Sequence, residues 1–393
     1  MFLTATNLLA YLTDVGLASA ADVVDHDLSI VELGRRNRNF RVMRSSGASL
    51  FVKQVPVVAA ETSLSLLREA GAGQLALEEA GLPTLAAVTP RLLRYDPRHH
   101  VLVQEVIPEA RCIAELLLRP DGIALDLVGA VAATLGRIHH ESARPGSLAR
   151  VAQCLGGEPP WIVEIGTRAE ALMPGMSGAS RELVDAIRAR PVLTGALALL
   201  GRTWRRTALM HGDVKWDNIV VAPTRDGGRQ IHLVDWELCN VGDPLWDMAG
   251  MMAALLQIWL LGGALGGDSR PGAQQAGAWP IGLVHPAAVC AWQAYRSEAG
   301  PLAGGAAPAQ QQLALLTGAR LVLMAFELSQ HIERTPPAAA MALSMAAHFF
   351  LQPAAALRDL LGLQDTASAP WPRAEQPWRV PAQPHFSVQE TMT

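Results

Sequence analysis

Two short polar motifs lie near the middle of the chain, one on each side of an apolar, β-branched stretch. The first, "HGDVKWDN", spans residues 211–218 and places Asp213 five positions before Asn218. The second, "VDWE", contains Asp235. Phosphoryl transfer from a nucleotide requires a carboxylate near the attacking hydroxyl, and an amide oxygen with a second carboxylate to hold Mg²⁺ against the phosphates. These three residue types occur in that order, so the motifs predict phosphoryl-transfer chemistry.

Each motif alone has a simpler structural interpretation. An isolated H-G-D can be a turn with a capping aspartate, and an isolated D-W-E can be the end of a strand. Here the two motifs are separated by a short apolar hairpin pattern and followed by "GDPLWDMA" at residues 242–249. This combination favours a functional site over two unrelated turns.

Lysine is almost absent from the chain. Among 32 Lys and Arg residues, only Lys53 and Lys215 are lysines. Arginine serves exposed ion pairs equally well, so we expect the two lysines where a compact ammonium is needed. Codon bias could also leave two lysines by chance, and each could be an ordinary exposed side chain. Lys53 lies in the strand-like segment "LFVKQ", and Lys215 follows Asp213 by two residues.

The pattern of apolar residues predicts a sheet followed by helices. Residues 29–54 alternate as three antiparallel strands, residues 61–80 have helical spacing, and a strand–turn–strand pattern ends near residue 107. Long Ala- and Leu-rich helical patterns follow at residues 122–142, 180–200, 285–298, 309–333 and 337–362. A small sheet lobe beside a large helical lobe predicts an α+β fold with its ligand in the cleft between them.

Composition and charge exclude several classes of partner. Half of the residues are hydrophobic and the formal net charge is −4. No basic run or face favours nucleic acid or an anionic membrane surface. The four cysteines are far apart and form no C-x-x-C pair, which is typical of reduced, mostly buried thiols in a cytoplasmic protein. The sequence does not determine the oligomeric state.

One uncharged segment has about the length of a membrane span. Residues 248–267, "MAGMMAALLQIWLLGGALGG", contain five glycines and Gln257 and lack flanking Lys or Arg. We therefore predict a buried core helix, with a membrane-attached protein as the alternative. The apolar N-terminus has no basic residue before Arg35, so we expect an amphipathic helix there and not a signal peptide.

The chain resembles the aminoglycoside phosphotransferase and choline kinase family, which shares the protein-kinase-like fold. The resemblance covers about residues 30–250 and rests on His211-Gly212-Asp213 with Asn218, on Asp235-Trp236-Glu237, and on Gly242-Asp243-Pro244 with Asp247-Met248-Ala249. It implies a bilobal α+β fold and an ATP- and Mg²⁺-dependent kinase. The implied division is a nucleotide-binding lobe at 1–105, a mainly helical lobe at 106–364 and a Pro-rich tail at 365–393.

The resemblance also implies roles for the central motifs. Asp213 would be the catalytic base or the residue that orients the hydroxyl, and Asn218 and Asp235 would be the magnesium ligands. Asp247 would be a buried acid that braces the catalytic loop, with His211 packed beneath it. Lys215 would neutralise charge on the transferred phosphate.

Residues of the N-terminal lobe are assigned to the nucleotide in the same way. Lys53 matches the family's phosphate-binding lysine, and Glu69 would be its partner on the helix. The loop "LGRRNRNF" has one glycine where protein kinases have three, so Asn39 or Asn37 would assist the neighbouring arginines there. In "VLVQEVIP", which would connect the two lobes, the backbone of Gln104, Glu105 and Val106 would contact adenine.

The phosphate acceptor is constrained mainly by charge. From residue 248 onward the chain has eight acidic residues and seven arginines, so this half is nearly neutral and does not favour a polycationic aminoglycoside. Trp259, Trp279 and Trp292 could bind a choline-like cation or could simply pack in the core. A neutral small-molecule hydroxyl is a further possibility. The alternatives are a Ser/Thr hydroxyl on a biosynthetic peptide and a catalytically silent nucleotide-binding module.

Overall fold

A five-stranded antiparallel sheet forms the N-terminal lobe of the computed structural model. Its strands follow the order β1-β2-β3-β5-β4. They are β1 (Leu28–Gly34), β2 (Arg38–Arg44), β3 (Leu50–Gln54), β4 (Leu92–Asp96) and β5 (Val101–Glu105). The predicted meander and the later strand–turn–strand unit are confirmed. The structure describes residues 2–19, 22, 28–34, 38–45, 47–55, 60–78, 81–119, 122–172, 175–261, 281–300 and 305–364.

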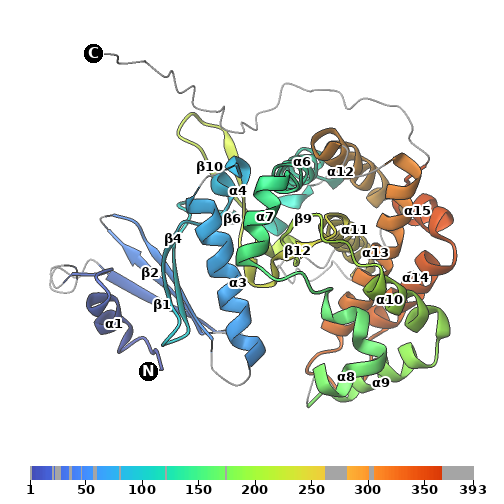
Figure 1. Cartoon of the computed structure of the whole chain (residues 1–393), viewed down its shortest axis with the longest axis horizontal. Coiled ribbons are helices and arrows are strands. Elements are labelled where there is room, and N and C mark those ends of the chain that lie inside the picture. Colours follow the sequence, from blue (N-terminus) through green and yellow to red (C-terminus); the bar gives the residue numbers. More distant parts are fainter. Residues whose placement is uncertain are drawn as a thin grey trace, which may run out of the picture.

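Helices cover both faces of this sheet (Figure 1). On one face, α1 (Leu8–Asp14) inserts Leu8 and Leu12 into a cluster with alternate residues of β2, β3 and β5. On the other face, α3 (Ala60–Leu77) packs Leu66 and Ala70 against Leu102 of β5. Because side chains alternate across a strand, neighbouring residues of β3 and β5 serve different faces. The α3 face is the one that turns toward the rest of the molecule.

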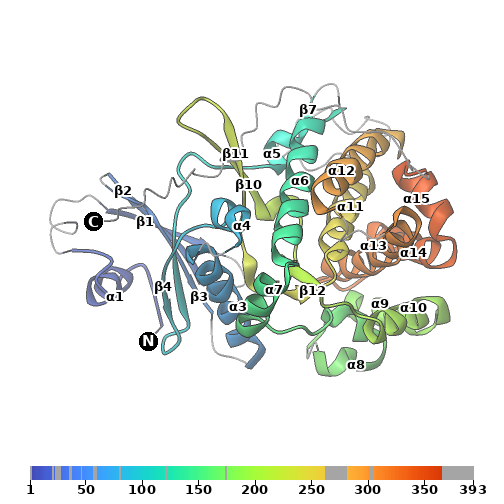
Figure 2. The ribbon, with the colours of Figure 1, turned by 45° about the horizontal axis from the view of Figure 1, so that its top comes forward.

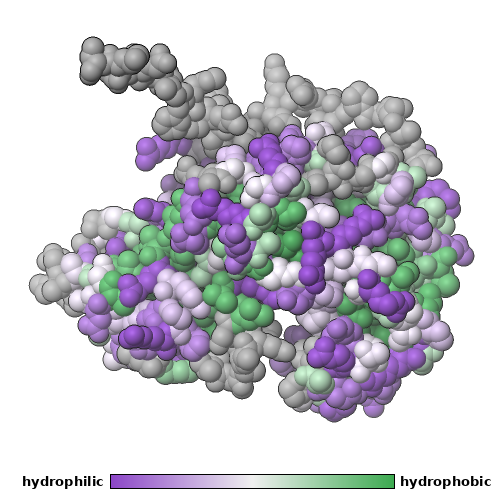
Figure 3. Space-filling view, viewed as in Figure 1, coloured by the Kyte–Doolittle hydropathy of each residue, from purple (hydrophilic) through white to green (hydrophobic). Residues whose placement is uncertain are grey.

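The C-terminal lobe is mainly helical, which confirms the bilobal α+β prediction. After the short α4 (Pro83–Val88), its helices are α5 (Ala114–Leu117), α6 (Leu125–Ser142), α7 (Pro145–Cys154), α8 (Ile165–Leu172), α9 (Gly178–Arg188), α10 (Pro191–Arg202), α11 (Leu245–Leu260), α12 (Val284–Ala299), α13 (Ala306–Leu328), α14 (Pro337–Leu351) and α15 (Pro353–Leu361). On the face seen in Figure 3, hydrophobic residues form separate patches on both lobes, each bordered by polar residues.

Prolines divide two helices that the apolar pattern predicted as continuous. The pattern at 180–200 becomes α9 and α10, and the pattern at 337–362 becomes α14 and α15. Pro191 and Pro353 each begin the second helix of a pair. A proline is well accommodated in the first turn of a helix, where its missing N–H needs no partner, but it interrupts a helix interior.

The apolar segment that begins at residue 248 lies inside the helical lobe. Helix α11 packs against α6, α12 and α13 (Figure 2), and nearly all of its side chains are buried. The prediction of a buried core helix is therefore confirmed as far as Leu260. Among the described residues, no helix combines the length and apolar character that a bilayer span needs. Residues 262–280, which include Trp279, the tail at 365–393 and Asn37 lie outside the described residues.

Short strands bring the two polar motifs together. Strand β9 (Ala208–Met210) pairs with β12 (Asn240–Gly242), so the loops that follow the first strand and precede the second lie side by side. Strands β10 (Ile219–Pro223) and β11 (Arg229–Leu233) form the predicted hairpin. The short β6 (Arg111–Cys112), which follows the connection between the lobes, pairs with β10. Strands β7 (Leu118–Arg119) and β8 (Gly122–Ile123) complete the set.

The four cysteines carry free thiols, as predicted. Cys239 and Cys290 are buried, Cys112 is half-buried and Cys154 is exposed. Burial raises the pKa of the Cys290 thiol to about 12, so it stays protonated near neutral pH. The expectation of mostly buried thiols is therefore wrong for Cys154.

Candidate active site

The loop of residues 211–218, here called the HGD loop, is held through its backbone by a buried carboxylate. Asp247, in the first turn of α11, accepts hydrogen bonds from the N–H groups of His211 at 2.7 Å and Gly212 at 2.9 Å. His139 of α6 lies 3.1 Å from the same carboxylate. Burial alone would raise the pKa of Asp247, but the hydrogen bonds and the nearby imidazoles outweigh it and lower that pKa.

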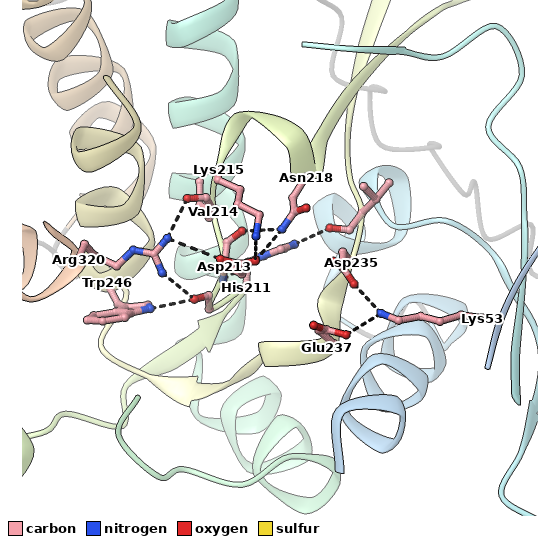
Figure 4. Close-up of polar contacts among 12 residues, drawn as sticks. Lys53, His211, Asp213, Val214, Lys215, Asn218, Asp235, Glu237, Trp246 and Arg320 are labelled. Atoms are coloured by element: carbon pink, nitrogen blue, oxygen red, sulfur yellow. Dashed lines mark hydrogen bonds and ion pairs between the residues drawn. The ribbon is translucent and has the colours of Figure 1, made fainter. Parts of the chain in front are cut away.

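A buried guanidinium holds the carbonyl groups of the same loop (Figure 4). Arg320, in the middle of α13, donates to the carbonyls of Gly212 and Val214, both at 3.2 Å. Its Nη2 also lies 3.7 Å from Asp213 Oδ1, and its guanidinium lies over the Trp246 ring at 5.2 Å. Arg320 was not predicted from the sequence. The available signal was an arginine inside the apolar stretch "TGARLVLMAF".

The carboxylate of Asp213 is surrounded by donors from its own loop (Figure 4). The Lys215 ammonium lies 2.6 Å from Oδ2, and the Asn218 amide nitrogen lies 3.0 Å from the same atom. Burial would raise the pKa of Asp213, but the Lys215 and Arg320 charges and the hydrogen bond from Lys215 outweigh it. The pKa therefore lies below its ordinary value. The structure thus brings together three of the predicted site residues.

Lys53, the other lysine of the chain, contacts residues of both lobes. Lys53 Nζ lies 2.9 Å from Glu69 of α3, 2.6 Å from Asp235 and 2.8 Å from Glu237. Burial opposes the charge, but the three carboxylates dominate and raise the pKa of Lys53 well above its ordinary value. Burial raises the pKa of Glu69 to about 7, only partly offset by Lys53, since three acids share one ammonium. Glu237 was not predicted, although D-W-E places it two residues after Asp235.

The backbone of Asp235 is in the left-handed region, with φ 65° and ψ 59°. Few residues other than glycine adopt this conformation, and aspartate tolerates it better than most. It turns the chain sharply into a short helical turn, Trp236–Leu238. Backbone strain of this kind is concentrated at functional sites, where it orients particular side chains. Here it leaves Asp235 and Glu237 both in contact with Lys53.

His211 packs beneath the loop, as predicted. Its Nε2 lies 3.0 Å from the Val234 carbonyl, and its ring lies 4.6 Å from the Trp236 ring, centroid to centroid. The side chain therefore connects the HGD loop to the segment that leads into Asp235.

Two oxygen donors fit a hard divalent cation. Asn218 uses its amide nitrogen for Asp213, so its oxygen is the end left for another ligand. Asp235 has a side chain that is 37% exposed. Within the residues described, no group of three or more His, Cys, Asp or Glu has the geometry of a metal site. The two oxygens of Asn218 and Asp235 could hold a cation such as Mg²⁺, which commonly uses one or two protein oxygens together with phosphates.

The remaining predicted residues lie on or next to the sheet. Asn39 is directly opposite Lys53 in the β2–β3 pair, so both point to the same face. Gln104, the last residue but one of β5, lies on that face as well. The N–H groups of Glu105 and Val106 are bonded to the carbonyls of Arg91 at 2.9 Å and Ser49 at 2.8 Å. These two donors are therefore already used within the protein.

A cavity of about 540 Å³ lies beside this connection between the lobes. Residues of the connection and of the β10–β11 hairpin line it, including Thr89, Glu105, Ile107, Pro223 and His232. None of the residues that surround Asp213 or Lys53 belongs to its lining.

The proposed cation site built from tryptophans is not supported at Trp292. This side chain is completely buried and stacks on Tyr295 with 6.1 Å between ring centroids. Core packing, the alternative interpretation, is correct for this residue. Trp259 is only partly buried and packs against the same core.

We expect Gly212→Ala to destabilise the protein more than a mutation of another left-handed glycine. Gly212 has φ +86°, and an added Cβ would lie 2.2 Å from the Leu238 carbonyl oxygen. The matched control is Gly227→Ala in the β10–β11 turn, where φ is +81° and no atom lies within 4 Å. The control should lose about 1–2 kcal/mol of unfolding free energy, the cost of the left-handed conformation alone. Equal losses for the two variants in urea unfolding would contradict the close approach of the two loops.

Comparison with known proteins agrees with this geometry. Residues 27–279 match the model of the phosphotransferase enzyme family (APH). Among solved structures, ethanolamine kinase from Plasmodium vivax has 13% identity and a TM-score of 0.53, covering 92% of this chain and 91% of that one. Choline kinase from Cryptosporidium parvum has 12% identity and a TM-score of 0.50, covering 90% and 96%.

A third structure, amicoumacin kinase in complex with AMP-PNP, Ca²⁺ and "Ami", has 12% identity and a TM-score of 0.50, covering 86% of this chain and 95% of that one. These likenesses show the fold. No curated protein matches the chain significantly. The family match extends over more than half of the sequence and includes the HGD loop, Lys53 and Asp235. The chain therefore belongs to the phosphotransferase enzyme family and is a phosphotransferase with the protein-kinase-like fold.

Proposed function

We propose that this enzyme transfers the γ-phosphate of ATP, in the presence of Mg²⁺, to a hydroxyl group of a small molecule. The observation that carries the proposal is the joint position of Lys53 from the sheet lobe with Asp235 from the helical lobe. Their side chains are in contact although they are separated by 182 positions in the sequence. A nucleotide bound between the lobes would meet both.

In this proposal Asp213 receives the acceptor hydroxyl. Its lowered pKa makes it a weak base in the resting enzyme, so it orients the hydroxyl and accepts the proton only as the bond to phosphorus forms. Lys215 shares the carboxylate and is 37% exposed at its side chain, so it can also reach toward a phosphate oxygen. Its positive charge would stabilise the negative charge of the transferred group.

The nucleotide phosphates would be held from the opposite side. Asn218 and Asp235 supply the oxygens for Mg²⁺, which neutralises charge between the β- and γ-phosphates when bound. Lys53, kept in place by Glu69, would exchange its contacts with Asp235 and Glu237 for phosphate oxygens. Asn39, opposite Lys53 on β2, is near enough to assist.

We place the acceptor beside α13, where Glu327 is a described acid that interacts with Asp213 and Lys215. Glu327 lies two helical turns beyond Arg320 on α13. Desolvation and the Asp213 charge raise its pKa, against the opposite effect of Arg320 and Lys215. One carboxylate suits a neutral or singly charged acceptor, whereas a polycation would need several. A catalytically silent protein would have no chemical need for Asp213, Asn218 and Asp235 together, so we favour an active enzyme.

Substitutions of two aspartates should separate chemistry from nucleotide binding. Asp213→Asn should reduce kcat by about 10²–10⁴, because the proton acceptor is lost, and leave Mg-ATP affinity nearly unchanged. Asp235→Asn should weaken Mg-ATP binding by about tenfold or more, because a metal ligand is lost. The measurements are steady-state kinetics and calorimetric titration. Asp217→Asn, an exposed acid of the same loop, is the control. The opposite pattern in the two variants would contradict the assigned roles.

The pH profile should respond to Lys215. Because the pKa of Asp213 is lowered, its active carboxylate form persists into acid, and activity should fall only as pH approaches that low pKa. Lys215→Met removes a charge that lowers the pKa, so the acid limb of kcat should move to higher pH. Arg358→Met, which removes an exposed cation paired with Asp359, should leave the limb in place. An unchanged limb in Lys215→Met would contradict the proposed coupling.

The acceptor class can be identified with a panel of alcohols. We expect mass spectrometry to detect a phosphorylated product from neutral or singly charged small alcohols with native enzyme and Mg-ATP, and none with Asp213→Asn. Phosphorylation of aminoglycosides alone would contradict the charge argument. Phosphorylation of Ser/Thr peptides alone would favour the peptide alternative, and binding of Mg-ATP without any product would favour a silent module.

A further inference from the structure

A buried glutamine lies on the cleft face of the N-terminal sheet. In the β3–β5 pair, Phe51 is opposite Gln104 and Lys53 is opposite Leu102. Directly opposed residues share a face, as do residues two apart on a strand, so all four point the same way. Leu102 packs on α3, and Lys53 reaches Asp235. Gln104 therefore faces the space between the lobes. It lies two residues along β5 from Leu102, the residue opposite Lys53, which is a distance of about 7 Å.

The side chain of Gln104 makes no hydrogen bond with another described residue, and the residue as a whole is 4% exposed. Gln54, a second buried glutamine of the same sheet, behaves differently. It points to the opposite face, accepts from the Leu3 N–H at 2.8 Å and donates to the His99 carbonyl at 2.9 Å. Neither amide atom of Gln104 is among the fully buried polar atoms that lack a partner, so this amide keeps some contact with solvent, whereas both ends of the Gln54 amide are used within the protein.

The backbone beside Gln104 offers few other donors. The N–H groups of Glu105 and Val106 are used by Arg91 and Ser49. The Gln104 side chain is thus a polar group still available at the end of the sheet away from the phosphates. A nucleotide with its phosphates near Lys53 would direct its base toward this end.

We propose that the Gln104 side-chain amide binds the exocyclic group at position 6 of the purine. This inference rests on the proposed function. An amide carries both a donor and an acceptor, and rotation about its last bond exchanges them. It can accept from the amino group of adenine or donate to the carbonyl oxygen of guanine. The enzyme therefore binds ATP and GTP with similar affinities, and it selects against a purine that lacks a group at position 6.

The test compares three nucleotides with the native protein and with Gln104→Met, which keeps the side-chain length and removes the amide. Calorimetric titration with Mg-ATP, Mg-GTP and the Mg-triphosphate of purine riboside, which has hydrogen at position 6, measures the affinities. The native protein should bind ATP and GTP within about tenfold of each other, and both about tenfold tighter than the purine riboside nucleotide, as expected for one hydrogen bond with a buried partner. In Gln104→Met the three affinities should agree within about twofold.

Gln54→Met is the matched control. It removes an amide of the same sheet from the other face, so it should lower stability without altering discrimination at position 6. If Gln104→Met does not fold, Gln104→Leu is the second variant, with the same expectation.

The possible outcomes separate the two proposals. Discrimination that persists in the folded Gln104 variant overturns the role of Gln104 and leaves the nucleotide site standing. Native protein that discriminates against GTP by far more than tenfold likewise overturns the inference. Native protein that binds none of the three triphosphates overturns the proposed function and the inference together.

Discussion

The active-site geometry depends on opposite charges buried on either side of one short loop. Asp247 receives the N–H groups of His211 and Gly212, and Arg320 donates to the carbonyls of Gly212 and Val214. A carboxylate accepts only and a guanidinium donates only, so Asp247 holds N–H groups of the loop and Arg320 holds its carbonyl groups. Each buried charge is satisfied by backbone dipoles, which removes much of the cost of burying it. Asp213 is thereby fixed between two anchored peptide groups.

The Lys53 cluster gives the cleft its electrostatic character. One ammonium contacts three carboxylates, from α3 and from the segment that begins at Asp235. Burial, together with the negative charges of Asp235 and Glu237, raises the pKa of Glu69, and the excess of negative charge makes the cleft favourable for a divalent cation. At Asp213 the balance is reversed, because Lys215 and Arg320 surround a single acid. The two ends of the site therefore differ in sign, as expected for a metal-bound donor on one side and a transferred phosphate on the other.

Much of the site was predictable because its chemistry is local in sequence. Asp213, Lys215 and Asn218 lie within one loop, and Asp235 follows the adjoining hairpin, so their order and spacing together with the family resemblance predicted that they form one site. Arg320 and Gln104 were harder to find. Arg320 lies more than a hundred residues from the loop it holds, in a helix whose pattern only predicts burial. Gln104 was predicted through its backbone, whereas its side-chain amide is the group that makes no hydrogen bond with another described residue.

The sequence by itself determined the α+β division, the order of the motifs and the identity of the charged groups, because strand alternation, helical spacing and motif chemistry are set by neighbouring residues. Only the tertiary structure decided which distant helix faces meet those motifs. The packed structure was needed to show that Trp292 is a core residue. It was also needed to show that Pro191 begins a separate helix. The reason is physical: local sequence sets the conformation of a segment, whereas the partner of a buried charge or amide is chosen when the segments pack together.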